Sequence, residues 1–311
     1  MSKTKDLTKL SVTQLKQFLT SFDVVMSDFD GVVWQIDHPI ANAFESLATL
    51  QKMGKQVYLV TNNSTRDSSA FSKLARHASL DISPDHVINT IKVIIWYLKK
   101  INFQDEVFAI VSNVARKQLI EAGIKLVEDP KFFADNQTAT VNEVIDRPSV
   151  KAVIVDFDVT VNWMKLALAI SCLERKDVLY IVGIMDNWIN IKTSPKINIL
   201  GPGPYIHIIS SQTERKPIVC GKPSSILKDY IFDKCNVTDP RRCLFIGDSS
   251  DQDMQFASMC GFTKLFVSTG VDTLEKAQKQ EDSCPDYYLP TLGQLFAAVE
   301  DLQNLCATIK N

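Results

Sequence analysis

The chain has 311 residues, of which 45% are hydrophobic and 23% are charged, the ordinary composition of a globular protein. At roughly 150 residues per domain, this length predicts two domains. The 34 basic and 36 acidic residues leave a net charge of −2. With no long block of either sign, the composition favours neither nucleic acid nor a membrane surface as the partner.

No apolar run approaches the roughly 20 residues that span a bilayer, which argues against a transmembrane protein. The polar, amphipathic N-terminus lacks the apolar core of a secretory signal. The seven cysteines are odd in number and none have CxxC spacing, so zinc clusters and thioredoxin-like chemistry are poorly supported. We therefore expect a cytoplasmic protein with reduced cysteines.

Short apolar runs rich in β-branched residues alternate with helical patterns, which predicts βαβ units around a mostly parallel sheet. Strands are expected at Val24–Met26, Gln56–Val60, Pro217–Cys220, Arg242–Ile246 and Thr263–Val267. Helices are expected over 64–79, 224–235, 251–260 and 292–306.

The central part of the chain has its own α/β pattern. Strands are expected at Glu106–Val111, Lys151–Phe157 and Val178–Ile184, with helices at Ala115–Ala122 and Asn162–Glu174. The segment Glu128–Arg147 is polar and predicted to be irregular, and Ser194–Gly203 is predicted to be a loop. We place domain boundaries near Phe103 and Glu214, so that residues 1–103 and 215–311 form a core and 104–214 an inserted domain.

Two carboxylates follow the first strand, in the motif Asp28-Phe29-Asp30-Gly31. Ligands of open α/β sheets bind outside the carboxyl ends of the strands. There, one carboxylate can attack phosphorus and the other can handle the proton of the leaving group. Gly31 permits the sharp turn that follows.

Three further strand ends carry groups suited to phosphoryl transfer. Thr61-Asn62-Asn63 offers a hydroxyl and amides near a helix N-terminus, which suits a phosphate oxyanion. Lys222 offers a positive charge for the transferred phosphoryl group. Gly247-Asp248, with Asp251 and Asp253 beyond it, offers the hard oxygen ligands that suit Mg²⁺.

These four motifs, in this order, resemble the haloacid dehalogenase superfamily. More narrowly, they resemble its 4-nitrophenylphosphatase-like (NagD-like) branch, with pyridoxal phosphatase and phosphoglycolate phosphatase. The resemblance implies an α/β fold, with a doubly wound, mostly parallel, Rossmann-like core sheet and a large α/β cap inserted between the second and third motifs. It also implies an enzyme, a Mg²⁺-dependent hydrolase of small phosphate monoesters that works through an aspartyl-phosphate.

The resemblance assigns roles to the carboxylates by position. Asp28 is the expected nucleophile and a Mg²⁺ ligand. Asp30 is the expected general acid and base, and its main-chain carbonyl also reaches the metal. Asp248 is expected to complete the protein ligands, and Asp253 to support Lys222 or a metal-bound water.

The same resemblance assigns the phosphate-binding groups and the partners. Thr61, Asn62, Asn63 and Lys222 are expected to hold the phosphate of a small phosphorylated metabolite. By resemblance alone, the cap is the expected contact of a homodimer.

Several positions depart from the branch. Phe29 stands where relatives have a small residue or cysteine, and Ser249-Ser250 replaces Arg-Leu. The cap segment Gly183–Trp188 replaces a Thr-Asn-x-Asp loop, and Pro202-Gly203-Pro204 matches a Gly/Ser-rich element only in part. These departures leave the substrate open.

Three alternatives remain beside these expectations. A catalytically weak relative that binds a phosphorylated ligand or a partner protein is the second functional hypothesis. Asp156-Phe157-Asp158 mimics the first motif but lacks the glycine, so we interpret it as a structural strand end. Asp186 and Trp188 either contact the substrate or belong to an exposed cap loop.

Overall fold

The computed structural model describes residues 4–35, 38–77, 80–133, 135–191 and 197–308. The chain forms two compact units, one of residues 1–61, 68–88 and 222–311 and the other of residues 62–67 and 89–221. The sequence placed the boundaries near Phe103 and Glu214 instead. The helix α4 (Thr90–Lys100) accounts for the larger difference, because it packs against α5 (Asn113–Glu121) of the second unit.

The first unit is built on a seven-stranded sheet with the order β1-β16-β15-β14-β2-β5-β6. From β1 through β5 every neighbouring pair is parallel. The strands are β1 (Lys5–Asp6), β2 (Val24–Ser27), β5 (Gln56–Thr61), β6 (Val87–Asn89), β14 (Cys243–Gly247), β15 (Thr263–Val267) and β16 (Tyr287–Leu289). The chain order reverses between β2 and β14, and this reversal is the point at which doubly wound sheets bind ligands.

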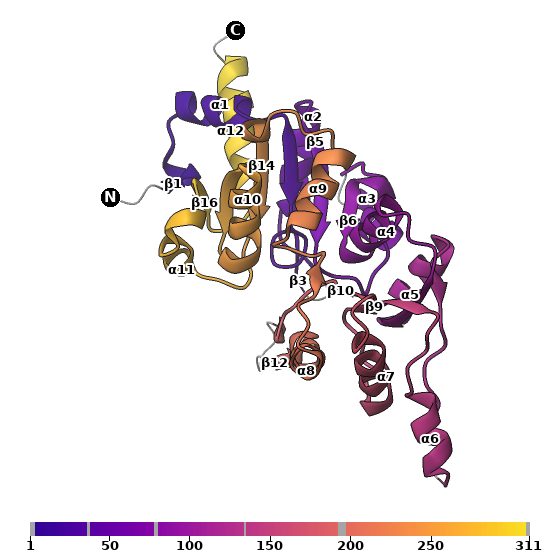
Figure 1. The fold of residues 1–311 in the computed structure, drawn as a ribbon. Coiled ribbons are helices and arrows are strands. Elements are labelled where there is room, and N and C mark those ends of the chain that lie inside the picture. Colours follow the sequence, from indigo (N-terminus) through magenta and orange to yellow (C-terminus); the bar gives the residue numbers. More distant parts are fainter. Residues whose placement is uncertain (1–3, 36–37, 78–79, 134, 192–196, 309–311) are drawn as a thin grey trace. The chain divides into compact units, whose positions relative to one another are not determined.

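Helices cover both faces of this sheet (Figure 1). The strand β14 shows why, because Leu244 and Ile246 point into the large core cluster while Phe245 packs on Phe256 of α10. The helices of this unit are α1 (Val12–Thr20), α2 (Ala43–Lys52), α3 (Ser68–His77), α9 (Ser225–Lys234), α10 (Gln255–Cys260), α11 (Leu274–Gln278) and α12 (Gly293–Thr308). Apart from this sheet, β3 (Trp34–Gln35) pairs antiparallel with β4 (His38–Pro39).

The second unit has a five-stranded parallel sheet with the order β13-β10-β9-β7-β8. Its strands are β7 (Glu106–Ile110), β8 (Lys125–Leu126), β9 (Val150–Val155), β10 (Leu179–Val182) and β13 (Ile218–Val219). The helices α7 (Trp163–Leu173) and α8 (Gly203–Thr213) pack on one face through a shared apolar cluster. These elements form an α/β domain of its own, as expected for a cap.

Two segments expected to be irregular contain regular structure. Glu128–Arg147 includes α6 (Gln137–Glu143), which begins where the Asn136 side chain accepts a hydrogen bond from the Ala139 N–H. The expected loop Ser194–Gly203 includes β12 (Ile197–Leu200), which pairs antiparallel with β11 (Trp188–Ile191). Residues 194–196 of that expected loop lie outside the described residues. Both elements were missed because proline, glycine and polar residues dominate these segments.

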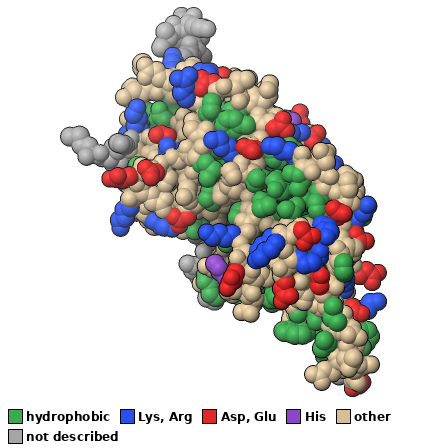
Figure 2. Space-filling model, in the orientation of Figure 1, with side chains coloured by type: hydrophobic (Ala, Val, Ile, Leu, Met, Phe, Trp, Pro, Cys, Tyr) green, Lys and Arg blue, Asp and Glu red, His purple; other side chains and the backbone are tan. Residues whose placement is uncertain are grey.

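The surface carries charges of both signs. On the face drawn in Figure 2, basic and acidic side chains are interspersed, in keeping with the net charge of −2. Among the residues that the structure describes, no helix has the length and apolar character needed to cross a membrane.

Candidate active site

The reversal in strand order brings the first and fourth motifs together. β2 and β14 are hydrogen-bonded neighbours, and the Asp28 N–H donates to the Ile246 carbonyl at 2.8 Å. Asp28 and Asp248 each follow the last residue of their strand. Two carboxylates that are 220 residues apart in the sequence therefore leave the same edge of the sheet.

Lys222 lies at the centre of this group. Its Nζ is 2.7 Å from Oδ1 of Asp28 and 2.7 Å from Oδ1 of Asp253, and it donates to the Val60 carbonyl at 3.0 Å. The lysine side chain is only 1% exposed. Burial acts to lower the pKa of Lys222, but the carboxylates of Asp253 and Asp28 outweigh it and raise the pKa, so the ammonium stays charged.

The second carboxylate oxygen of Asp253, which does not contact Lys222, binds the backbone. Its Oδ2 accepts hydrogen bonds from the Asp248 and Ser249 N–H groups at 3.0 and 3.1 Å. A π-helical turn over Ser250–Met254 places the side chain there. Gly247 is required beside it, because a Cβ at that position would lie 2.2 Å from the Cβ of Asp253.

Asp248 is oriented by the loop that follows β15, which lies outside the four sequence motifs. Its Oδ2 accepts a hydrogen bond from the Val271 N–H. A Cβ at Gly270 would lie 1.5 Å from that same oxygen, so only glycine fits there. The sequence contains an indication of this loop, because Ser268-Thr269-Gly270 directly follows the strand β15, just as each of the four motifs follows a strand.

The buried carboxylates of the site carry more negative charge, when ionised, than the Lys222 ammonium can neutralise. Oxygens of Asp28, Asp248 and Asp253 lie within 4.8 Å of one another, and all three residues are buried. Burial raises the pKa of Asp28 to about 7, although Lys222 opposes the shift. Burial, with Asp253 and Asp28 adding to it, also raises the pKa of Asp248 well above its usual range. A divalent cation fits this donor set, because it would neutralise the excess negative charge.

Asp30 and Thr61 complete the part of the site within the first unit. Asp30 is exposed, and its charge contributes to the raised pKa of Asp28. Gly31 follows with φ of 89°, and its carbonyl accepts a hydrogen bond from the Thr269 hydroxyl at 2.5 Å. Thr61 is the buried last residue of β5.

Asn62 and Asn63 belong to the second unit, although they directly follow Thr61. A Cβ at Gly221 would lie 2.9 Å from Oδ1 of Asn62, so this side chain packs beside the residue that precedes Lys222. The Asn63 side chain accepts from the Thr65 N–H at 2.9 Å, as in a turn that leads toward a helix.

Two cap segments that depart from the branch pattern pack against each other. Gly203 N–H donates to the Asp186 carbonyl at 2.8 Å, and Gly201 N–H donates to the Asn187 carbonyl at 3.0 Å. Side chains at either glycine would collide with this loop. Trp188 is 58% exposed. The roles of Asp186 and Trp188 toward a substrate stay predictions.

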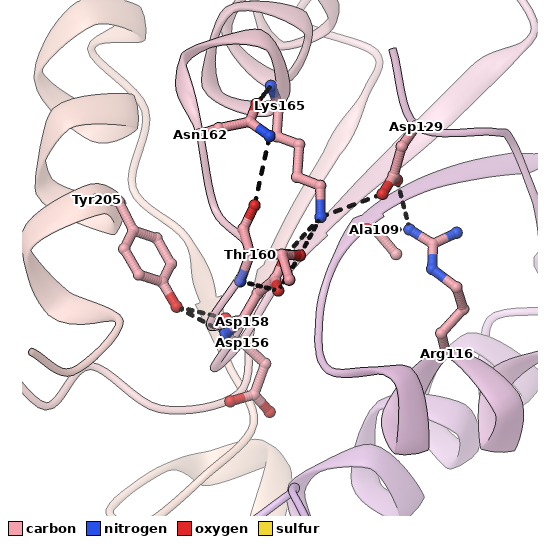
Figure 3. Close-up of polar contacts among 9 residues, drawn as sticks. All are labelled: Ala109, Arg116, Asp129, Asp156, Asp158, Thr160, Asn162, Lys165 and Tyr205. Carbon is pink, nitrogen blue, oxygen red and sulfur yellow. Dashed lines mark hydrogen bonds and ion pairs between the residues drawn. The ribbon is translucent and has the colours of Figure 1, made fainter. Parts of the chain in front are cut away.

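Asp156-Phe157-Asp158 has partners of its own inside the cap (Figure 3). Oδ2 of Asp156 accepts a hydrogen bond from the Thr90 hydroxyl at 2.7 Å, and its Oδ1 accepts from the Phe157 N–H. Oδ2 of Asp158 pairs with Nζ of Lys165 at 2.8 Å. Burial raises the pKa of Asp156 to about 6, while the Thr90 bond opposes the shift. These contacts agree with a structural strand end.

The Lys165 pair extends into a network of matched charges. Nζ of Lys165 also lies 3.1 Å from Asp129, whose other oxygen is 2.6 Å from Nη2 of Arg116. Arg116 in turn donates to the Ala109 carbonyl at 2.8 Å. Two carboxylates and two cations thus join the ends of β7 and β9, which makes the network a support of the cap.

The chain is similar in sequence to known hydrolases. Residues 25–125 match a family model described as haloacid dehalogenase-like hydrolase, and residues 219–295 match a second, HAD-hydrolase-like model. The glycerol-3-phosphate phosphatase of Gallus gallus is 30% identical over 91% of this chain and 94% of its own length. Phosphoglycolate phosphatase 2 of Arabidopsis thaliana is 29% identical over 94% and 98%.

Solved structures share the fold. The 4-nitrophenylphosphatase of Thermotoga maritima has a TM-score of 0.73 at 23% identity, covering 90% of this chain and 98% of its own. A glycerol phosphate phosphatase of Mycobacterium tuberculosis, solved with magnesium, has a TM-score of 0.71 at 20% identity, covering 89% and 77%.

Replacing Asp158 with alanine will destabilise the cap. The change leaves the Lys165 ammonium, 9% exposed, with Asp129 but without its nearer carboxylate, and it removes the acceptor of the Thr160 N–H and hydroxyl, which together cost about 2 kcal/mol. The free energy of unfolding from urea denaturation measures the loss. Asp177→Ala is the matched control, because it removes a 2.7 Å pair with Lys151 on an exposed surface and should change stability little. Equal effects of both changes would contradict the role of burial.

Proposed function

This chain belongs to the haloacid dehalogenase-like hydrolases, in their 4-nitrophenylphosphatase (NagD-like) branch, and we propose that it is a Mg²⁺-dependent phosphatase of small phosphate monoesters. The observation that carries the proposal is the contact of Asp28 with Lys222, inside a group of three buried carboxylates. A carboxylate held against an ammonium ion at the end of a central strand can serve as the nucleophile beside a phosphate-binding cation.

In the first step, a carboxylate oxygen of Asp28 attacks phosphorus and the bond from phosphorus to the ester oxygen breaks. Asp30, protonated, gives its proton to the departing oxygen, so the products are an alcohol and an aspartyl-phosphate. Asp30 is exposed whereas Asp28 is buried, which supports the assignment of proton transfer to Asp30 and nucleophilic attack to Asp28.

In the second step, water attacks the phosphorus of the aspartyl-phosphate. Asp30, now ionised, takes a proton from that water, and the bond between phosphorus and the Asp28 oxygen breaks. Inorganic phosphate leaves, and Asp28 and Asp30 return to their starting states.

The carboxylates of Asp28 and Asp248 and the main-chain carbonyl of Asp30 would hold Mg²⁺. When bound, the ion offsets the repulsion between the nucleophilic carboxylate and the phosphate dianion. Asp253 has a supporting role, because its two oxygens already bind Lys222 and the backbone N–H groups of the Asp248 loop. Thr61, Asn62, Asn63 and Lys222 would bind the phosphate.

Names of relatives suggest the substrate class. Relatives include phosphatases named for glycerol 3-phosphate, phosphoglycolate and 4-nitrophenyl phosphate. We extend this class to the present chain, and include pyridoxal phosphate, as small phosphorylated metabolites. A cytoplasmic location and a homodimer formed through the cap remain part of the proposal. Sedimentation of the purified chain tests the homodimer.

Hydrolysis of p-nitrophenyl phosphate, with Mg²⁺ and after exhaustive chelation, tests the proposal directly. We expect turnover that disappears with chelation and returns when Mg²⁺ is added. A folded chain that binds phosphorylated metabolites but hydrolyses none would favour a binding protein instead.

Asp28→Asn will abolish turnover, because an amide is a poor nucleophile and a weaker metal ligand. Steady-state hydrolysis of p-nitrophenyl phosphate measures the loss, and circular dichroism checks the fold. Asp23→Asn, at the other end of β2, is the control and should keep wild-type activity. Wild-type activity in a sequence-verified Asp28→Asn preparation would exclude the mechanism.

Asp30→Asn will discriminate between leaving groups. An alkyl phosphate releases a basic alkoxide that needs a proton, whereas p-nitrophenolate leaves with little help. We expect kcat/KM to fall by roughly 10²–10⁴-fold for the alkyl ester and distinctly less for p-nitrophenyl phosphate. Equal losses for both esters would show that Asp30 only positions the metal or Asp28.

A further inference from the structure

Asp272 lies between β15 and α11, outside the motifs that the sequence assigned to catalysis. Its side chain is 6% exposed. Oδ2 of Asp272 accepts hydrogen bonds from both the N–H and the hydroxyl of Ser250, at 2.8 and 2.5 Å. Ser250 is fully buried and begins the turn that leads from Asp248 to Asp253. One carboxylate oxygen therefore holds the middle of the segment that joins these two residues.

The same residue holds one end of that segment through its backbone. The Asp272 N–H donates to the Asp248 carbonyl at 3.1 Å, next to the Val271 N–H that binds the Asp248 carboxylate. Oδ1 of Asp272 lies 2.9 Å from Nζ of Lys276. The lysine keeps the carboxylate in place, so Asp272 can accept from Ser250 without moving toward solvent.

The carboxylates of the site need such a restraint. Asp28, Asp248 and Asp253 lie at short range, and in the ionised form that binds a metal these carboxylates repel one another, which favours their separation. Without Asp272, the buried donors of Ser250 would also lose their acceptor, which gives the turn a reason to rearrange.

We propose that Asp272 is a positioning residue that holds Asp248, together with the turn to its supporting neighbour Asp253, in the arrangement needed to bind Mg²⁺. The inference rests on the proposed function. It adds a residue that the motifs do not contain, on a segment that approaches the metal ligands from the neighbouring strand β15.

The test is Mg²⁺ binding to the full chain, measured by isothermal titration calorimetry. Asp272→Ala should raise the Mg²⁺ dissociation constant by roughly 10–100-fold, the usual effect of losing a residue that supports a metal ligand. The Mg²⁺ concentration that half-saturates p-nitrophenyl phosphate hydrolysis should rise by the same factor, and excess Mg²⁺ should restore turnover. A loss of folded protein would instead lower turnover at every Mg²⁺ concentration.

Asp286→Ala is the matched control. Asp286 also accepts a backbone N–H, at 2.8 Å, and pairs with a lysine side chain, at 3.3 Å, but both belong to Lys264 near the start of β15. Its Mg²⁺ dissociation constant should equal that of the wild type. Should Asp272→Ala not fold, Ser250→Ala removes only the hydroxyl contact and should weaken Mg²⁺ binding in the same direction by a smaller factor.

Mg²⁺ binding by the wild type tests the proposed function, and the difference between the wild type and the variants tests the positioning role of Asp272. If the wild type binds Mg²⁺ and folded Asp272→Ala, or Ser250→Ala in its place, binds it equally well, the positioning role is wrong and the proposed function stands. If the wild type binds no Mg²⁺, the metal part of the proposed function and this inference fail together. A rise for the Asp272 variant with none for Asp286→Ala supports the inference.

Discussion

Lys222 joins Asp28 and Asp253 through two contacts of 2.7 Å in a position that water scarcely reaches. Burying a charged lysine is costly unless carboxylates surround it, and here they do. A third carboxylate, Asp248, lies within reach of the same group, and burial, with the neighbouring carboxylates adding to it, raises the pKa of both Asp28 and Asp248. The site is thus built around a deficit of positive charge, and a divalent ion would correct it.

The cap offers a comparison within the same chain. Asp156-Phe157-Asp158 repeats the letters of the first motif and also follows a parallel strand. There, however, Asp158 and Asp129 are matched by Lys165 and Arg116 (Figure 3). In the cap network the carboxylates and the cations are equal in number, which suits a structural role. In the candidate active site the carboxylates outnumber the lysine ammonium, which suits the binding of a metal ion. The surroundings of the aspartates, more than the motif itself, separate the two roles.

The departures from the branch pattern also acquire physical meaning. Ser249-Ser250 replaces the expected Arg-Leu, and Ser250 uses its polar atoms to bind Asp272. In the cap, the divergent segments 183–188 and 201–203 depend on each other, because the glycines of one lie against carbonyls of the other. Substitutions that look isolated in the sequence are therefore paired in the fold, and the paired cap loops are where differences in substrate choice are expected.

Local signals in the sequence determined the strands, the residues that end them and the α/β class, because β-branched runs, turn residues and helix caps act over a few positions. Asp28, Asp30, Thr61, Lys222 and Asp248 could be proposed for that reason, with the family resemblance supplying their roles. Regular elements inside Pro-, Gly- and Asn-rich segments, such as α6 and β12, were missed because their local signals are weak.

Only the tertiary structure decided which charges are paired. The reversal between β2 and β14 brings together residues more than 200 positions apart. The contact between Ser250 and Asp272 likewise joins the loops that follow the neighbouring strands β14 and β15. Such contacts depend on the order of strands in the sheet, which no local sequence pattern encodes.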